Sequence, residues 1–192
     1  MENRNLYTYF GPMFSGKSEK LVTVYHSLSD PKAIFKPSID TRDEVLIKSR
    51  HGEQAIAIPL KNIEEVFNYL KTPKKEMHLF FDEVFMFGGD LVETVKKLLE
   101  LGYFVHIGGL DTNYLGNPFV ETQILISMTP ECNKHKLHGW CHICNKPSNW
   151  TVRLTNGVLD GPETPLIVVD DGRNDTIYQT RCDEHKRYNS LK

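Results

Sequence analysis

The sequence predicts an α/β fold: an open, mostly parallel sheet flanked by helices, followed by a small metal-binding module at the C-terminal end. Three observations lead to this prediction. Strand-like and helix-like segments alternate through the first part of the chain, a glycine loop joins the first strand to the first helix, and all four cysteines follow residue 131. We therefore expect a P-loop α/β domain over residues 1–136 and a zinc-binding domain over residues 137–192.

Strands are expected where short apolar, aromatic or β-branched runs occur, over residues 6–10, 33–37, 55–60, 77–81 and 103–107. Helices are expected where apolar residues recur at helical spacing, over residues 17–28, 63–70 and 89–101. The polar residues 38–52 are expected to form a loop. Because ligands of open parallel sheets bind at the carboxyl ends of the strands, the site is expected near the glycine loop, Asp82, Glu83 and Asp111.

Composition excludes several classes of function. The chain has 192 residues, of which 40% are hydrophobic and 25% charged, so it can form a packed core. Its net charge of -2 shows no basic excess, which argues against a nucleic-acid partner. The sequence has no apolar run long enough to cross a membrane and begins with polar residues rather than a signal peptide, so a cytoplasmic protein is expected.

The glycine loop fits the pattern G-x-x-x-x-G-K-[ST] completely. It consists of Gly11, Pro12, Met13, Phe14, Ser15, Gly16, Lys17 and Ser18. In such a loop the backbone N–H groups surround phosphate oxygens, the lysine contacts the outer phosphates, and the serine hydroxyl binds Mg²⁺. A chance match on a glycine turn is the alternative, and the strand before the loop and the helix after it argue against chance. The loop therefore predicts binding of a nucleotide such as ATP.

Two acids end the apolar run over residues 77–81. Asp82 stands where P-loop proteins carry the acid that holds Mg²⁺, although an ordinary acid at a strand end is the alternative. Glu83 could take a proton from an attacking hydroxyl, or it could be a solvated surface residue. The sequence alone leaves both readings of Glu83 open.

Two ligand pairs predict a structural zinc site. Cys141 and Cys144 form one pair, Cys182 and His185 form the other, and 37 residues separate the pairs. Four protein ligands complete a tetrahedral zinc site and leave no open position for catalysis. The pinned segment between the pairs, residues 145–181, is called the lasso below. Cys132 is expected to be an ordinary thiol outside the site.

The order of these motifs resembles the type II thymidine kinases, a P-loop and zinc-lasso family. The resemblance rests on the P-loop, Asp40-Thr41-Arg42, Asp82-Glu83, Gly109-Leu110-Asp111, Thr151-x-Arg153, and Tyr178 ahead of the second ligand pair. It implies transfer of the γ-phosphate of ATP to the 5′-hydroxyl of thymidine, and a homotetramer. It also implies Glu83 as general base and Arg42 at the transferring phosphate, with Asp40 close by.

The resemblance further implies a nucleoside pocket formed by the lasso and the core of the P-loop domain. Met13, Leu110 and Thr151 would surround the 5-methyl group. Its other residues would be Met86, Tyr114, Phe119 and Tyr178, although Tyr178 could equally be a packing residue.

The sequence departs from the family pattern around the nucleoside. Phe85 replaces the usual glutamine, Met86 replaces a phenylalanine, Tyr114 replaces a phenylalanine, and Asp171–Asp175 replaces the usual Gly-Gly of the lasso. The substrate could thus be thymidine, deoxyuridine or a 5-modified analogue. Two other functions remain: an inactive nucleotide-binding regulatory homologue, and a P-loop NTPase that acts on a partner or nucleic acid.

Overall fold

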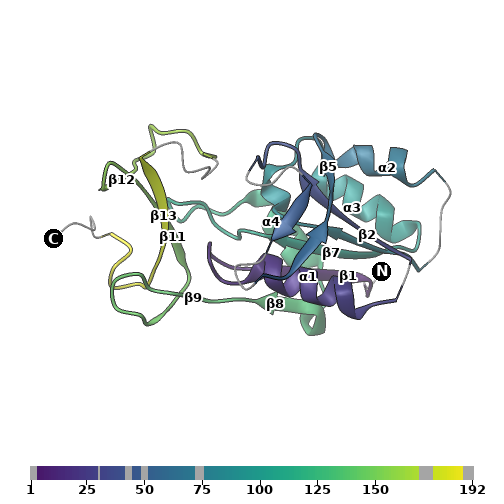
Figure 1. Cartoon of the computed structure of the whole chain (residues 1–192), viewed down its shortest axis with the longest axis horizontal. Coiled ribbons are helices and arrows are strands. Elements are labelled where there is room, and N and C mark those ends of the chain that lie inside the picture. The colour runs from purple at the N-terminus through teal and green to yellow at the C-terminus, as the bar shows by residue number, and fades with distance from the viewer. Residues whose placement is uncertain are drawn as a thin grey trace.

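The fold is that of a computed structural model, which describes residues 4–29, 31–41, 45–48, 52–71, 76–168 and 175–187. The sheet and its helices form one lobe and the C-terminal strands form a second lobe, joined by extended segments (Figure 1). Among the described residues, no helix combines the length and apolar character needed to cross a membrane.

A six-stranded sheet forms the centre of the larger lobe, with strand order β5-β2-β6-β7-β1-β8 and every pairing parallel. Its strands are β1 (Leu6–Phe10), β2 (Lys32–Pro37), β5 (Ile58–Leu60), β6 (His78–Phe81), β7 (Phe104–Gly109) and β8 (Lys134–Lys136). The predicted α/β class is therefore confirmed. Strand β8 was not anticipated, because its Lys-His-Lys sequence lacks the apolar residues that mark a strand.

Helices cover both faces of this sheet. The α-helices are α1 (Lys17–Ser27), α2 (Val66–Tyr69), α3 (Leu91–Glu100) and α4 (Val120–Met128), and short 3₁₀ turns occur at Ile63–Glu65, Val84–Met86 and Glu131–Asn133. Alternate residues of β2 and β6 point to opposite faces: Phe35 and Phe81 pack with α3, whereas Ile34 and Phe80 pack with α1. Helix α4 was not predicted, because apolar residues stand on its exposed side as well as its buried side.

Two sequence-based expectations are corrected near the edge of the sheet. The single strand expected over residues 55–60 is two strands: β4 (Gln54–Ile56) pairs with β3 (Leu46–Lys48), and β5 pairs with β2. The chain changes sheet at Ala57, whose N–H donates to the carbonyl of Val45. The loop expected over residues 38–52 contains β3, which is stabilised by pairing with a later segment rather than by a local pattern.

Histidines lie under the sheet on the α1 face. The ring of His106 stacks on Tyr7 at 4.4 Å, and its Nε2 lies 3.0 Å from Nδ1 of His78. The hydroxyl of Tyr9 lies 3.4 Å from Nδ1 of His106, and the ring of Tyr9 stacks on His135. Burial, together with the imidazoles of His78 and His135, lowers the pKa of His106 to about 3. His106 is therefore neutral in the folded protein.

The described residues of the smaller lobe form short antiparallel sheets. A hairpin pairs β9 (Gly139–Trp140) with β10 (Pro147–Ser148), and a second sheet has the order β12-β11-β13. Its strands are β11 (Trp150–Thr155), β12 (Val158–Leu159) and β13 (Thr176–Arg181). The division into two domains at residue 136 stays a prediction, with β8 as the last strand of the main sheet before it.

Candidate active site

The P-loop joins β1 to α1, which is the context that the sequence predicted. Gly16 ends the loop with φ 82°, and Phe14 also has a left-handed backbone, with φ 62°. Nζ of Lys17 donates to the carbonyl of Pro12 at 2.7 Å, and the hydroxyl of Ser15 donates to the same carbonyl at 2.8 Å. The lysine is 6% exposed, so its charge lies inside the loop, where phosphate oxygens would approach the backbone N–H groups.

The first glycine of the loop contacts the segment that leads to the smaller lobe. A Cβ atom at Gly11 would lie 2.2 Å from the carbonyl oxygen of Leu137, and Gly11 has φ 147°. The N–H of Leu137 donates to the carbonyl of Phe10 at 2.8 Å. The absence of a side chain at Gly11 therefore lets the segment after β8 pass directly beside the phosphate loop.

A polar cavity of about 380 Å³ lies beside the start of α1. Its walls include Ser18, Asp82, Asp40 and Lys36, so the predicted Mg²⁺ pair, Ser18 and Asp82, is brought together. Nζ of Lys36 lies 3.5 Å from Oδ2 of Asp40, and both side chains are buried. Lys36 was missed in the sequence; a lysine inside the otherwise apolar β2 is the signal that could have identified it. Arg42, the other predicted residue at the phosphate, lies outside the described residues.

Asp82 and Glu83 are neighbours in sequence, yet their side chains border different cavities. Asp82 borders the polar cavity, whereas Glu83 borders the apolar pocket described next. The change of direction occurs at Glu83, which has a left-handed backbone with φ 49° and ψ 47°. Such a conformation in a residue with a side chain is strained and is enriched at functional sites. The turn at Glu83 therefore separates the two acids, with Asp82 at the polar cavity and Glu83 at the apolar pocket.

An apolar pocket of about 540 Å³ lies between the P-loop, the segments after β6 and β7, and the lasso. Eight of the predicted residues border it: Met13, Glu83, Met86, Leu110, Tyr114, Phe119, Thr151 and Tyr178. Asp40 does not border this pocket; it lies in the polar cavity. The structure brings together every predicted nucleoside-pocket residue that the resemblance named, and their roles in binding stay predictions.

Five further residues border the pocket: Phe85, Asn113, Leu166, Ile167 and Val168. Phe85 had been noted only as a departure from the family pattern; its ring lies 4.7 Å from that of Phe119. The apolar run Leu166–Val168 inside a polar lasso could have been recognised in the sequence. Asn113 carried no sequence signal, and its Oδ1 accepts from the N–H groups of Leu115 and Asn117, so this side chain shapes the turn after β7.

Tyr114 ties the pocket to the lasso. Its hydroxyl lies 3.0 Å from the carbonyl of Gly161 and 2.9 Å from the hydroxyl of Thr164. The guanidinium of Arg153 lies over the Tyr114 ring, 3.9 Å from its centroid, and pairs with the buried carboxylate of Asp160. Tyr178 contributes a second tie, because its hydroxyl donates to the carbonyl of Val168 at 2.7 Å. These contacts fold the lasso residues 160–168 over the pocket.

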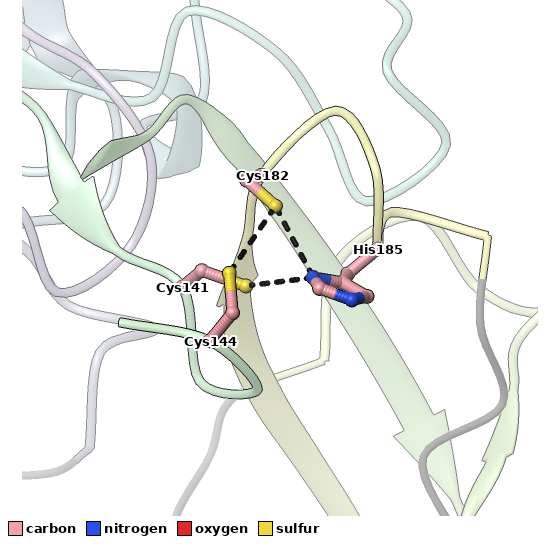
Figure 2. A group of neighbouring side chains, drawn as sticks. All are labelled: Cys141, Cys144, Cys182 and His185. Carbon is pink, nitrogen blue, oxygen red and sulfur yellow. Dashed lines mark hydrogen bonds between the residues drawn. The ribbon is translucent and has the colours of Figure 1, made fainter. Parts of the chain in front are cut away.

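The four predicted zinc ligands lie together in the smaller lobe, and their side chains point toward one another (Figure 2). Their ligand atoms all lie within 4.8 Å of one another, including 3.7 Å from Sγ of Cys144 to Sγ of Cys182. A tetrahedral zinc ion with Zn–S bonds of about 2.3 Å sets its ligand atoms about 3.8 Å apart, so the cluster fits such an ion. Burial raises the pKa of Cys141, but backbone N–H groups outweigh it and lower that pKa to about 6, which favours the thiolate.

Cys132 does not belong to this cluster, as the sequence predicted. It is exposed, and its Sγ contacts Asn133.

Comparison with known proteins identifies the family. A family profile described as thymidine kinase matches residues 4–186. The chain belongs to the thymidine kinase family. A curated thymidine kinase of Mycoplasma genitalium is 34% identical over 181 residues, which cover 93% of this chain and 81% of that relative. The resemblance seen in the sequence is thereby confirmed, and membership in the thymidine kinase family implies a nucleotide-binding transferase that uses ATP and Mg²⁺.

Proposed function

We propose that this enzyme transfers the γ-phosphate of ATP to the 5′-hydroxyl of thymidine, deoxyuridine or a 5-modified analogue, which yields the monophosphate for pyrimidine salvage. One observation carries the proposal: among the described residues, Glu83 is the one carboxylate at the border of an apolar pocket whose wall includes the P-loop residue Met13. The acceptor hydroxyl and the donor phosphates can therefore meet beside one candidate base.

The chemistry requires positioning and charge neutralisation more than covalent help. In the proposed reaction, Lys17 and the loop N–H groups bind the donor phosphates, and Ser18 and Asp82 hold Mg²⁺, which neutralises phosphate charge. Glu83 accepts the proton of the 5′-hydroxyl as the oxygen attacks phosphorus. Arg42 contacts the transferring phosphate, and Lys36 orients Asp40 close to it.

The pocket supports selection of a pyrimidine by its apolar walls. Met13, Leu110 and Thr151 would surround the substituent at position 5 of the base, and Phe85 with Phe119 would form a neighbouring aromatic wall. Polar recognition of the base is assigned mainly to lasso backbone groups, as the resemblance implies; Oδ1 of Asn113, which also borders the pocket, already accepts two backbone N–H groups. Zinc bound by the four ligands would keep both ends of the lasso in place.

The decisive experiment measures ATP-dependent phosphorylation of thymidine, deoxyuridine and 5-modified deoxynucleosides by the wild type and by Glu83→Gln. Loss of a general base lowers kcat by about 10²- to 10⁴-fold, and thymidine binding should be retained. Glu131→Gln is the matched control, because Glu131 is an exposed carboxylate paired with Lys134, and its neighbour Asn133 binds the start of β1, at the opposite end of that strand from the P-loop. Full turnover in Glu83→Gln would refute the assignment of the base.

Nucleotide and nucleoside binding without turnover in the wild type would favour an inactive regulatory homologue. The homotetramer implied by the resemblance is also part of the proposal. Exposed Val120 and Ile124 on α4 offer an apolar surface for association. Light scattering of the purified protein measures this assembly.

A further inference from the structure

Two threonines of the smaller lobe bind both polar backbone groups of one P-loop residue. The N–H of Met13 donates to Oγ1 of Thr151 at 2.8 Å, and Oγ1 of Thr180 donates to the carbonyl of Met13 at 2.7 Å. Thr151 on β11 and Thr180 on β13 are directly opposite each other in the antiparallel register. Both are almost completely buried, with 3% and 2% exposure, so neither hydroxyl is exchanged readily for water.

These two bonds determine the orientation of two successive peptide planes. A trans peptide is planar, and its C=O and N–H point in opposite directions. When Thr180 binds the Met13 carbonyl, the N–H of Phe14 points in the opposite direction within the same plane. When Thr151 accepts the Met13 N–H, the Pro12 carbonyl is directed toward Lys17 and Ser15, which both bind it.

The position of Thr180 is itself tightly constrained. Gly139 of β9 packs against it so closely that a Cβ atom there would lie 2.5 Å from Cγ2 of Thr180. The carbonyl of Thr180 accepts from the N–H of His142 at 2.9 Å. Thr180 is therefore a rigid point in the smaller lobe rather than a mobile surface hydroxyl.

We propose that Thr180 is a positioning residue for the donor nucleotide, acting through the backbone of Met13. Its hydroxyl sets the Met13–Phe14 peptide and thereby aims a loop N–H at the phosphates. Thr151 borders the nucleoside pocket directly, whereas Thr180 reaches the site only through the backbone of Met13, whose carbonyl it binds. This inference rests on the proposed function, since it concerns the donor half of the same site.

The test compares steady-state kinetics of the wild type, Thr180→Val and Thr180→Ser, with ATP and thymidine varied separately. Valine keeps the shape of threonine but leaves the buried Met13 carbonyl without its donor. We expect Thr180→Val to raise the KM for ATP about tenfold, which corresponds to about 1.4 kcal/mol. The KM for thymidine should rise less than the KM for ATP, because the lost bond orients the Met13–Phe14 peptide, while the hydrogen bond from the Met13 N–H to Thr151 remains. Thr180→Ser keeps the hydroxyl and should stay close to the wild type.

Thr155→Val is the matched control. It removes a hydroxyl from the same sheet, where Thr155 pairs with Thr176 at 3.1 Å, remote from the P-loop. Zinc content should be the same in Thr180→Val and in this control, and the melting temperatures of both should stay above the temperature of the assay.

The inference is overturned if Thr180→Val keeps the wild-type KM for ATP, if serine fails to rescue, or if Thr155→Val shows the same loss. A wild type without kinase activity would instead refute the proposed function, which separates the two failures.

Discussion

Acid should destabilise this protein through His106. The residue is 2% exposed, and its pKa falls from the ordinary 6.5 to about 3 because of burial and the neighbouring imidazoles. A histidine whose pKa is lowered by folding binds its proton more readily in the unfolded chain. Its contribution to stability is therefore present above pH 6.5 and is lost as the pH falls from 6.5 toward 3. Burial also lowers the pKa of His78 and His135, which adds to the loss in the same direction.

The magnitude follows from the two pKa values. The difference between 6.5 and about 3, at about 1.4 kcal/mol for each pH unit, gives about 5 kcal/mol when the loss is complete. Between pH 7.5 and pH 5, only the part between 6.5 and 5 is lost, which is about 2 kcal/mol. A loss of about 2 kcal/mol is large compared with the free energy of unfolding of a folded domain, which is typically about 5–15 kcal/mol.

The variant His106→Phe measures this contribution, because phenylalanine can stack on Tyr7 but cannot be protonated. Urea unfolding followed by far-ultraviolet circular dichroism reports on the larger lobe, since the described α-helices all lie there. The free energy of unfolding of the wild type should fall about 2 kcal/mol more than that of the variant from pH 7.5 to pH 5. Acid release of zinc affects both proteins and cancels in the difference.

His138→Gln is the control, because His138 is exposed and bonds only Asn149 among the described residues. It should follow the wild-type pH dependence. Equal pH dependence in the wild type and His106→Phe would refute the reasoning.

Two further predictions concern the lasso. Tyr114→Phe removes the hydroxyl that bonds Gly161 and Thr164, so the KM for thymidine should rise about three- to tenfold with little change in kcat. Tyr69→Phe, at an exposed ring, is the kinetic control. An unchanged KM for thymidine in Tyr114→Phe would contradict the role of this hydroxyl in holding the lasso over the pocket. Cys144→Ser should lower bound zinc, measured by mass spectrometry, from about one ion per chain, and lower the melting temperature, whereas exposed Cys132→Ser should change neither.

The parts of the fold and site that were predictable from sequence depend on local patterns. The P-loop has its residues at fixed spacing, the zinc pairs each span four positions, and β6 is a continuous apolar run that ends in two acids. Such patterns require no knowledge of which distant segments meet. The pocket residues on four separate segments were predicted only because the ordered motifs resemble a known family.

The missed features depend on contacts between distant segments. Strand β8 is recognisable only through its pairing with β1, and the division at Ala57 only through the pairing of β4 with β3. The pocket residues Leu166–Val168 reach their place because Tyr114 and Tyr178 bind carbonyls of the lasso. No local periodicity encodes these contacts.

Gly11 has a consequence for how this enzyme can vary. A glycine at the start of a phosphate loop is usually explained by the ligand, which needs the backbone to come close. Here a methyl group at Gly11 would collide with the chain itself, 2.2 Å from the carbonyl oxygen of Leu137. Even a descendant that had lost all use for ATP would remain under pressure to keep this glycine, because alanine would push the segment after β8 away from the loop. Retention of the motif in such a descendant would therefore be poor evidence that it still binds nucleotide.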